Sequence, residues 1–234
     1  MSTSIQAYWL GHSTFRFVSP NGSVIYVDPF LTNNPKTPDS EKNPDKIDYI
    51  LLTHGHEDHV GDTIDLAKKT GARVLGILEL VGLLQKHGLP QDKSLDINKG
   101  GTVAFDDFKV TMTSANHSSS FRGEYAGDPA GLVIRFSDGY TVYDAGDTNI
   151  MPDMALYGEL YKPDMALLPI GDHYTMDPVE AALAVKLIKP KIAVPIHYGT
   201  WPPLTGSPQK FKELVEKETS TQVLIPKVGE NFMK

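Results

Sequence analysis

The chain has 234 residues, of which 40% are hydrophobic and 22% are charged, and it contains no Cys. A chain of this length can bury a full hydrophobic core without disulfides or structural metals. The absence of Cys excludes disulfides, thiolate metal sites and a Cys nucleophile. With 22 basic and 29 acidic side chains the net charge is −7, which argues against general binding to phosphate backbones.

The sequence shows no targeting or membrane-spanning segment. The first residues lack a basic stretch followed by an apolar one, and no apolar run approaches the roughly 18 residues of a membrane helix. Low-complexity segments and linkers are also absent from the sequence. We therefore expect a cytoplasmic protein without a membrane partner, folded as one domain over residues 1–234.

The first third of the chain has the pattern of β-hairpins. Aromatic and β-branched residues dominate Ile5–Leu10, Thr14–Val18 and Val24–Val27. Asn21-Gly22 between the last two runs supplies the positive φ angles of a tight hairpin turn. A long loop, Leu31–Lys46, then carries three prolines, and loops of this length in compact domains are often functional.

Three short apolar runs later in the chain share one design, because each ends just before a histidine. Nearly continuous apolar runs are typical of strands buried on both faces. The pairs are Ile47–Leu52 with His54, Met165–Ile170 with His173, and Ile192–Ile196 with His197.

A helix is predicted between the second and third of these strands. Asp177 is the expected N-cap, followed by Pro178 and by Glu180 at the third helical position, before Ala181–Ile188. The resulting strand–helix–strand unit makes the two strands parallel. Their carboxyl ends, with His173 and His197, then lie at one edge of the sheet, where α/β proteins place ligands.

The remaining pattern repeats the same order of a β-rich segment and an α/β segment. Two half-domains, each a sheet with outer helices, would pack sheet to sheet. The further elements we expect are helices Asp62–Lys69 and Leu78–His87 and strands Arg73–Ile77, Thr102–Phe105, Phe108–Thr113, Leu132–Phe136 and Thr141–Tyr143.

The strongest functional signal is the segment His54-Gly-His-Glu-Asp-His59. Three His and one Asp fall within six positions directly after a buried strand. In an extended segment His54 and His56 project to the same side and can hold one ion. Asp58 and His59 leave in another direction as the chain turns into a helix, and could reach a second ion. A solvated histidine-rich turn is the weaker alternative, because His and carboxylate clusters are metal-ligand chemistry.

Three more potential ligands stand at strand ends. His117 follows the strand Phe108–Thr113, Asp147 follows Thr141–Tyr143, and His197 follows Ile192–Ile196. Side chains from separate strands converge at such positions.

Together these residues resemble the metallo-β-lactamase superfamily over nearly the whole chain. The motif positions of this family occur in the same order in this chain, as Asp28, the His-x-His-x-Asp-His cluster, His117, Asp147 and His197. The segments around His12, Asp147 and His197 are similar to a compact branch of metal-dependent hydrolases related to ascorbate-6-phosphate lactonase. The resemblance implies a four-layer αββα sandwich of two packed mixed sheets with outer helices.

The resemblance also assigns metal ligands. It gives His54, His56 and His117 to a first ion, Asp58, His59 and His197 to a second, and Asp147 to both. It implies two divalent ions, with Zn the first expectation and Mn, Fe and Ni the alternatives. Hydroxide activated between them would attack a small ester-like substrate, either a lactone or a phosphorylated small molecule.

Other residues are candidates for supporting roles. Asp58 could also accept a proton, and His173 could contact substrate or protonate the leaving group. Asp28 would orient a ligating His or its loop, and His12 is either site-lining or simply buried. Ser118 and Arg122 could line the substrate site, and Arg122 or Lys36 could bind a substrate phosphate or carboxylate, although a solvated surface Arg is the simpler interpretation.

Alternative functions remain at this stage. One is phosphodiester cleavage of a nucleotide or nucleic acid, and another is metal binding without catalysis. A redox di-iron role is disfavoured, because that branch of the superfamily typically has Glu where this chain has His56. Members of the compact branch often carry His at the position of Asp144. The expected partner is a small-molecule substrate, and a monomer and a homo-oligomer fit equally well.

Overall fold

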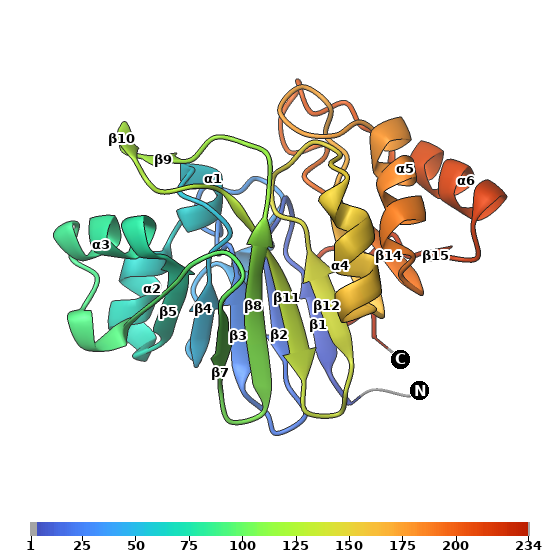
Figure 1. Ribbon diagram of the computed structural model, residues 1–234. Coiled ribbons are helices and arrows are strands. Elements are labelled where there is room, and N and C mark those ends of the chain that lie inside the picture. The colour runs from blue at the N-terminus through green and yellow to red at the C-terminus, as the bar shows by residue number, and fades with distance from the viewer. Residues whose placement is uncertain (1–3, 234) are drawn as a thin grey trace.

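The computed structural model describes residues 4–233, and two β-sheets form its centre (Figure 1). The first sheet has the order β1-β2-β3-β4-β5-β6, and the second has the order β15-β14-β13-β12-β11-β8-β7. The first consists of β1 (Gln6–Trp9), β2 (Phe15–Val18), β3 (Val24–Val27), β4 (Tyr49–Leu51), β5 (Arg73–Ile77) and β6 (Ser94–Ile97). The second consists of β7 (Thr102–Ala104), β8 (Phe108–Ser114), β11 (Ala130–Phe136), β12 (Thr141–Asp144), β13 (Met165–Pro169), β14 (Ile192–Ile196) and β15 (Gln222–Val223). A separate hairpin pairs β9 (Ser120–Phe121) with β10 (Glu124–Tyr125).

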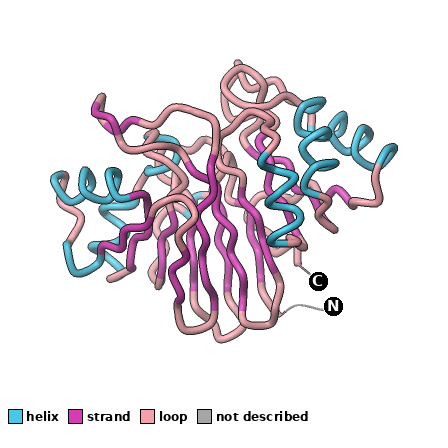
Figure 2. The backbone as a smooth tube through the Cα atoms, viewed as in Figure 1, coloured by secondary structure: helices cyan, strands magenta, loops and turns pink. Residues whose placement is uncertain are grey.

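Helices cover the outer faces of the two sheets (Figures 1 and 2). One flank carries α2 (Thr63–Thr70) and α3 (Leu78–Lys86), and the opposite flank carries α4 (Asp153–Tyr161), α5 (Pro178–Ile188) and α6 (Pro208–Glu218). The short α1 (Glu57–Val60) and two 3₁₀ turns, Asp39–Glu41 and Gln91–Lys93, complete the described elements. Within residues 4–233, no helix is both long and apolar enough to cross a bilayer.

The sheets pack face to face over a shared hydrophobic core. Phe17 on β2 and Phe136 on β11 bring their ring centroids to 6.1 Å across this core. A second core lies between the second sheet and its helices and includes Leu168 of β13 and Val185 of α5. Every residue of β13 is buried, as the continuous apolar run predicts. The expected fold class is confirmed.

Local signals placed most of the central elements correctly. Helix α5 begins with the predicted Asp177 cap, whose carboxylate accepts hydrogen bonds from the backbone N–H groups of Val179 and Glu180 at 2.8 Å. Strands β13 and β14 on either side of this helix are parallel, as expected. The run Ile47–Leu52 yields a shorter strand than predicted, β4, because its ends turn into loops.

Sequence reasoning did not anticipate α4 and α6. In α4 the apolar side chains lie on both faces, and Leu156 and Leu160 are exposed, so no helical period stands out. Helix α6 does carry readable signals, namely Ser207 as an N-cap before Pro208.

Strand directions bring the polar residues of the sequence motifs to one edge. Strands β1, β3 and β4 run the same way in the first sheet, and β8, β12 and β14 run the same way in the second. Backbone hydrogen bonds tie the two sheets together there, from Ala130 N–H to the Thr53 carbonyl at 3.0 Å and from His197 N–H to the His12 carbonyl at 3.1 Å. The loops that follow these strands therefore meet at a fixed edge.

Candidate metal centre

A first group of donors consists of His54, His56 and His117. One nitrogen from each ring lies within 4.8 Å of the other two, which is close enough to hold one ion. His54 Nε2 and His56 Nδ1 face each other at 3.0 Å. His54 is fully buried, whereas His56 and His117 are partly exposed.

A second group lies beside the first and contains Asp58, His59 and His197, joined by His12. One donor atom from each of the four lies within 4.8 Å of the others. His59 and His197 are buried. Both point Nε2 at Asp58 Oδ2, and each distance is 3.9 Å.

The carboxylate of Asp147 lies between the two groups. Its Oδ2 is 3.0 Å from His197 Nε2 and 3.3 Å from His59 Nε2 on one side. On the other side the same oxygen is 3.6 Å from His117 Nε2 and 4.0 Å from His54 Nε2. One buried oxygen atom thus faces histidines of both groups.

The hydrogen-bond network fixes which nitrogen of His54 is free. Thr53 donates its hydroxyl proton to the carboxylate of Asp28 at 2.6 Å. Its oxygen lies 3.0 Å from His54 Nδ1 and must accept there, so the proton of His54 is on Nδ1. The lone pair of His54 is then on Nε2, which points at His56 and Asp147.

Asp28 fixes His59 in the same way. Its Oδ2 lies 2.7 Å from His59 Nδ1, and an ionised carboxylate only accepts hydrogen bonds. His59 therefore donates from Nδ1 and presents Nε2 to Asp58 and Asp147. That buried Nε2, like the buried Oδ1 of Asp147, makes no hydrogen bond within the described residues.

This donor set fits divalent metal ions. Imidazole nitrogens and carboxylate oxygens are the ligands that Zn and its neighbours in the first transition row prefer. The orphaned atoms on His59 and Asp147 are buried polar groups that would be costly without a partner. A ligating histidine usually donates a hydrogen bond from the ring nitrogen that does not face the metal, as His59 does from Nδ1 to Asp28.

The charges of the cluster are strongly coupled. Burial lowers the pKa of His54 well below its ordinary value, and the neighbouring His59 adds to this effect. Burial acts in the same direction on His59, but the carboxylates of Asp147 and Asp28 outweigh it and hold its pKa well above the ordinary value. A cation is therefore favoured next to Asp147, whether that cation is a proton on His59 or a metal ion.

Comparison with known proteins decides the family. The model of the β-lactamase superfamily domain matches residues 23–198. A metal-dependent hydrolase of the UPF0173 group from Herpetosiphon aurantiacus is 46% identical over 228 residues, which cover 95% of each chain. A further member of the group from Rubrobacter xylanophilus is 45% identical over 230 residues, covering 96% of this chain and 94% of the relative.

The chain belongs to the metallo-β-lactamase superfamily. Its relatives identify it as a metal-dependent hydrolase. Among solved structures, Igni18, a metallo hydrolase from Ignicoccus hospitalis, superposes with a TM-score of 0.87 at 37% identity and 97% coverage of both chains.

In this hydrolase His12 contacts the second group without offering it a lone pair. Its Nε2 lies 3.0 Å from Asp58 Oδ2, and its Nδ1 lies 2.9 Å from the hydroxyl of Thr200. Because the carboxylate only accepts, His12 donates from Nε2, and Thr200 donates to Nδ1. Burial and the adjacent His197 lower the pKa of His12 to about 4, which keeps the ring neutral. His12 therefore holds Asp58 in place.

Three of the buried site residues adopt a left-handed backbone conformation. The φ angles are 57° at His12, 45° at Asp28 and 56° at His197. This conformation costs non-glycine residues free energy. Such strain is common at functional sites, where the backbone must orient a side chain. Sequence reasoning could not foresee it, because nothing local marks these positions.

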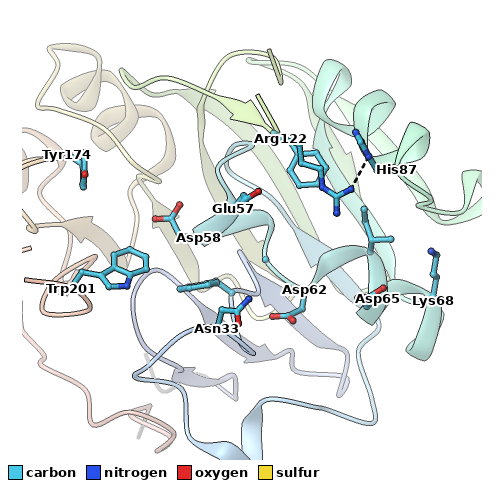
Figure 3. A pocket seen from close by; sticks show the side chains of 14 residues that line it. Asn33, Glu57, Asp58, Asp62, Asp65, Lys68, His87, Arg122, Tyr174 and Trp201 are labelled. Atoms are coloured by element: carbon cyan, nitrogen blue, oxygen red, sulfur yellow. Dashed lines mark hydrogen bonds between the residues drawn. The ribbon is translucent and has the colours of Figure 1, made fainter. Parts of the chain in front are cut away.

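A cleft of about 660 Å³ opens beside Asp58 (Figure 3). Phe30 and Trp201 line it near the metal ligands, with ring centroids 5.9 Å apart. Arg122 and His87 lie on the far side and share a hydrogen bond of 3.1 Å. The cleft therefore reaches the second donor group at Asp58.

The remaining candidates take different positions. Ser118 is exposed and places its hydroxyl 3.4 Å from His56 Nε2. Arg122 lines the cleft, and Lys36 does not. His173 is an exposed residue beside Tyr174, outside both donor groups and outside the lining of the cleft. The structure therefore does not bring His173 to the cluster, and its role as a proton donor remains a prediction.

Sequence reasoning missed several residues of the site. His87 was expected to serve as a helix terminus alone, yet it also holds Arg122 at the cleft. Thr200 and Lys68 were not singled out at all, although Thr200 contacts His12 and Lys68 lines the cleft. Their positions depend on tertiary packing between distant loops, which no motif records.

Proposed function

We propose that this hydrolase cleaves a small ester-like substrate, a lactone or a phosphorylated small molecule, at a centre of two divalent metal ions. His54, His56 and His117 would hold one ion, Asp58, His59 and His197 the other, and Asp147 both. The observation that carries the proposal is the position of Asp147 Oδ2, within 4.0 Å of imidazole nitrogens from both groups. Each ion would then have three ligands of its own and would share Asp147, which leaves room for water and substrate, as is typical of catalytic sites.

When bound, such a pair of ions lowers the pKa of water and polarises the bond under attack. The chain's own residues prepare this chemistry. Asp28 and Thr53 direct the lone pairs of His59 and His54 inward. Asp58 has one oxygen fixed by His12 and also lines the cleft, so it is a proposed ligand that could accept a proton there.

The protonation state of Asp58 suits an acceptor of this kind. Burial acts to raise its pKa, but His59 and the hydrogen bond from His12 outweigh burial and hold the pKa below the ordinary value. The carboxylate is therefore ionised at neutral pH and available for a ligand bond or a proton.

The cleft supports a small substrate. Its volume of about 660 Å³ suits a metabolite-sized molecule. Phe30 and Trp201 offer apolar contacts to a substrate beside Asp58. The net charge of −7 disfavours a long polyanionic substrate.

The test is a hydrolysis screen on protein loaded separately with Zn and with Mn. It covers lactones, phosphomonoesters, phosphodiesters, thioesters and β-lactams. We expect turnover of a lactone or a phosphorylated small molecule that stops on chelation and returns when metal is restored. Asp147→Asn serves as the inactive variant, and Asp172→Asn, on an exposed loop, is the matched control. Chelation-insensitive turnover, or turnover that survives in the Asp147 variant, would refute the proposal.

A further inference from the structure

We propose that Arg122, assisted by Lys68, binds an anionic group of the substrate at the end of the cleft away from Trp201. The group is a carboxylate or a phosphate attached at a distance from the bond that is cleaved. This inference rests on the proposed function and narrows its substrate to small anionic esters or lactones.

Arg122 stands in a turn that its residue type does not favour. It is the first of the two residues that join β9 to β10, where Phe121 pairs with Glu124. Both turn residues have positive φ angles, 51° at Arg122 and 82° at Gly123. Such a turn favours Asn or Gly at both positions. An arginine at the first position is a local conflict of the kind expected where function requires a side chain.

The guanidinium of Arg122 is held at the cleft by contacts with two aromatic side chains. It lies over the ring of Phe121, 5.1 Å from the centroid, and it donates to His87 Nδ1 at 3.1 Å. Because a guanidinium only donates, His87 Nδ1 must carry the lone pair. Both contacts orient the group without placing a carboxylate on it, and the carboxylate of Glu124 faces His87 Nε2 at 3.8 Å.

Neither cation of the cleft is paired with a carboxylate. In the described chain, Lys99 and Lys191 form ion pairs with Asp128 and Asp164, whereas Lys68 and Arg122 form none. Both are exposed side chains that line the cleft. An oxyanion with two oxygens can take two parallel hydrogen bonds from a guanidinium, which is the strong form of this interaction.

The other charges of the cleft dictate where an anion can lie. Glu57, Asp62 and Asp65 also line it and would repel an anion placed near them. Asp62 accepts hydrogen bonds of 2.9 Å from the backbone N–H groups of Leu31 and Thr32 and so fixes their loop. The favourable position for a negative group is therefore beside Arg122.

The arrangement then orients the substrate. In Figure 3, Arg122, His87 and Lys68 lie on one side of Asp58, and Trp201 and Tyr174 lie on the other. With its anionic group at Arg122, a small ester presents its scissile bond at Asp58 and an apolar portion to Trp201. A neutral ester of the same size has no such anchor.

The test compares two nitrophenyl esters of equal chain length, one acyl chain ending in a methyl group and the other in a carboxylate. A second pair replaces the carboxylate with a phosphate. The metal-loaded wild type is compared with Arg122→Met and Lys68→Met. The control is Arg73→Met, because Arg73 is also an exposed arginine over a phenylalanine ring but lies outside the cleft.

We expect the wild type to prefer an anionic ester and Arg122→Met to lower the ratio of kcat/KM for the anionic over the neutral ester by about 10- to 100-fold, chiefly through KM. Lys68→Met should lower the ratio less, and Arg73→Met should not change it. The two pairs show whether carboxylate or phosphate is the natural group. A ratio near one in the wild type, or one unaffected by Arg122→Met, would overturn the anchor while leaving hydrolysis of esters intact.

A second measurement keeps the anchor testable if no ester is hydrolysed, which would count against the proposed function alone. In the Zn-loaded protein, the Nε–H resonance of Arg122 is followed by NMR while glutarate or phenyl phosphate is added. A saturating shift with either anion, absent with neutral glutaramide and weakened in Lys68→Met, supports the anchor. A resonance that does not move with either anion overturns it.

Discussion

His12 and Asp58 lie 46 positions apart in the chain, yet His12 Nε2 donates a hydrogen bond of 3.0 Å to Asp58 Oδ2. The histidine is buried, whereas the side chain of Asp58 is 26% exposed toward the cleft. The same histidine accepts a hydrogen bond from the N–H of His197 at its backbone carbonyl, 3.1 Å away. One residue in the turn between β1 and β2 thus contacts two proposed ligands of the second ion.

Replacing His12 tests this role. We expect His12→Ala to weaken binding of the second ion, the one assigned to Asp58, His59 and His197, by about 10- to 100-fold. The reason is that the carboxylate of Asp58 loses its fixed orientation. Competition with a chromogenic chelator measures the affinity. Thr200→Val should act in the same direction but less, since His12 keeps its bond to Asp58, and it guards against a fold damaged by the larger change. Unchanged affinity in both variants would show that His12 is merely buried.

Asp28 is predicted to support metal binding without touching metal. Its carboxylate accepts hydrogen bonds from His59 Nδ1 at 2.7 Å and from the Thr53 hydroxyl at 2.6 Å. Asp28→Asn removes the charge and should lower metal affinity by about 10- to 100-fold while the protein remains folded. Isothermal titration of metal into the chelated protein measures the change, with circular dichroism as the check on folding. Tight binding in this variant would contradict the account.

Asp144 should make stability depend on pH. Burial raises its pKa to about 7, with the nearby Asp28 adding to the effect. Because the folded state holds this proton more tightly than the unfolded state, the free energy of unfolding should fall as pH rises from about 4 to 7. We therefore expect Asp144→Asn to stabilise the metal-depleted protein by about 1–3 kcal/mol at pH 8 and to change little at pH 4. Urea unfolding at the two pH values tests this, and equal effects at both would contradict it.

A change at the N-terminal cap of α5 should alter the free energy of unfolding without altering activity. Asp177 caps the helix through Val179 and Glu180, far from the donor groups in the chain. Asp177→Ala should lower the free energy of unfolding by about 0.5–2 kcal/mol. Metal content and kcat of the folded enzyme should match those of the wild type. A loss of metal in this variant would mean that the metal centre depends on α5 more than its contacts indicate.

Local signals predicted the fold and the donor groups because each rests on short-range chemistry. The runs before His54 and His197 are continuous and apolar, so they indicate buried strands whose ends lie at one edge. Position singled out the cluster His54–His59 and the strand-end residues His117 and Asp147, whereas the family resemblance assigned them as metal ligands, which stays a prediction.

The parts that sequence did not predict depend on contacts between loops. The partnership of Thr200 with His12 joins positions 188 residues apart, and that of Arg122 with His87 joins positions 35 apart. His173 shows the converse, since its strand-end position was read correctly but its side chain is exposed. A strand end places a residue near an edge, and loop conformation decides where its side chain points.

The number of metal ions per chain tests the central claim most directly. Elemental analysis of the protein after metal loading and gel filtration should give two ions per chain for the wild type. It should give fewer than one for Asp147→Asn, because Asp147 Oδ2 faces histidines of both donor groups. The control Asp172→Asn should retain two. A single ion in the wild type, or two ions held equally tightly in Asp147→Asn, would contradict a centre built around a shared carboxylate.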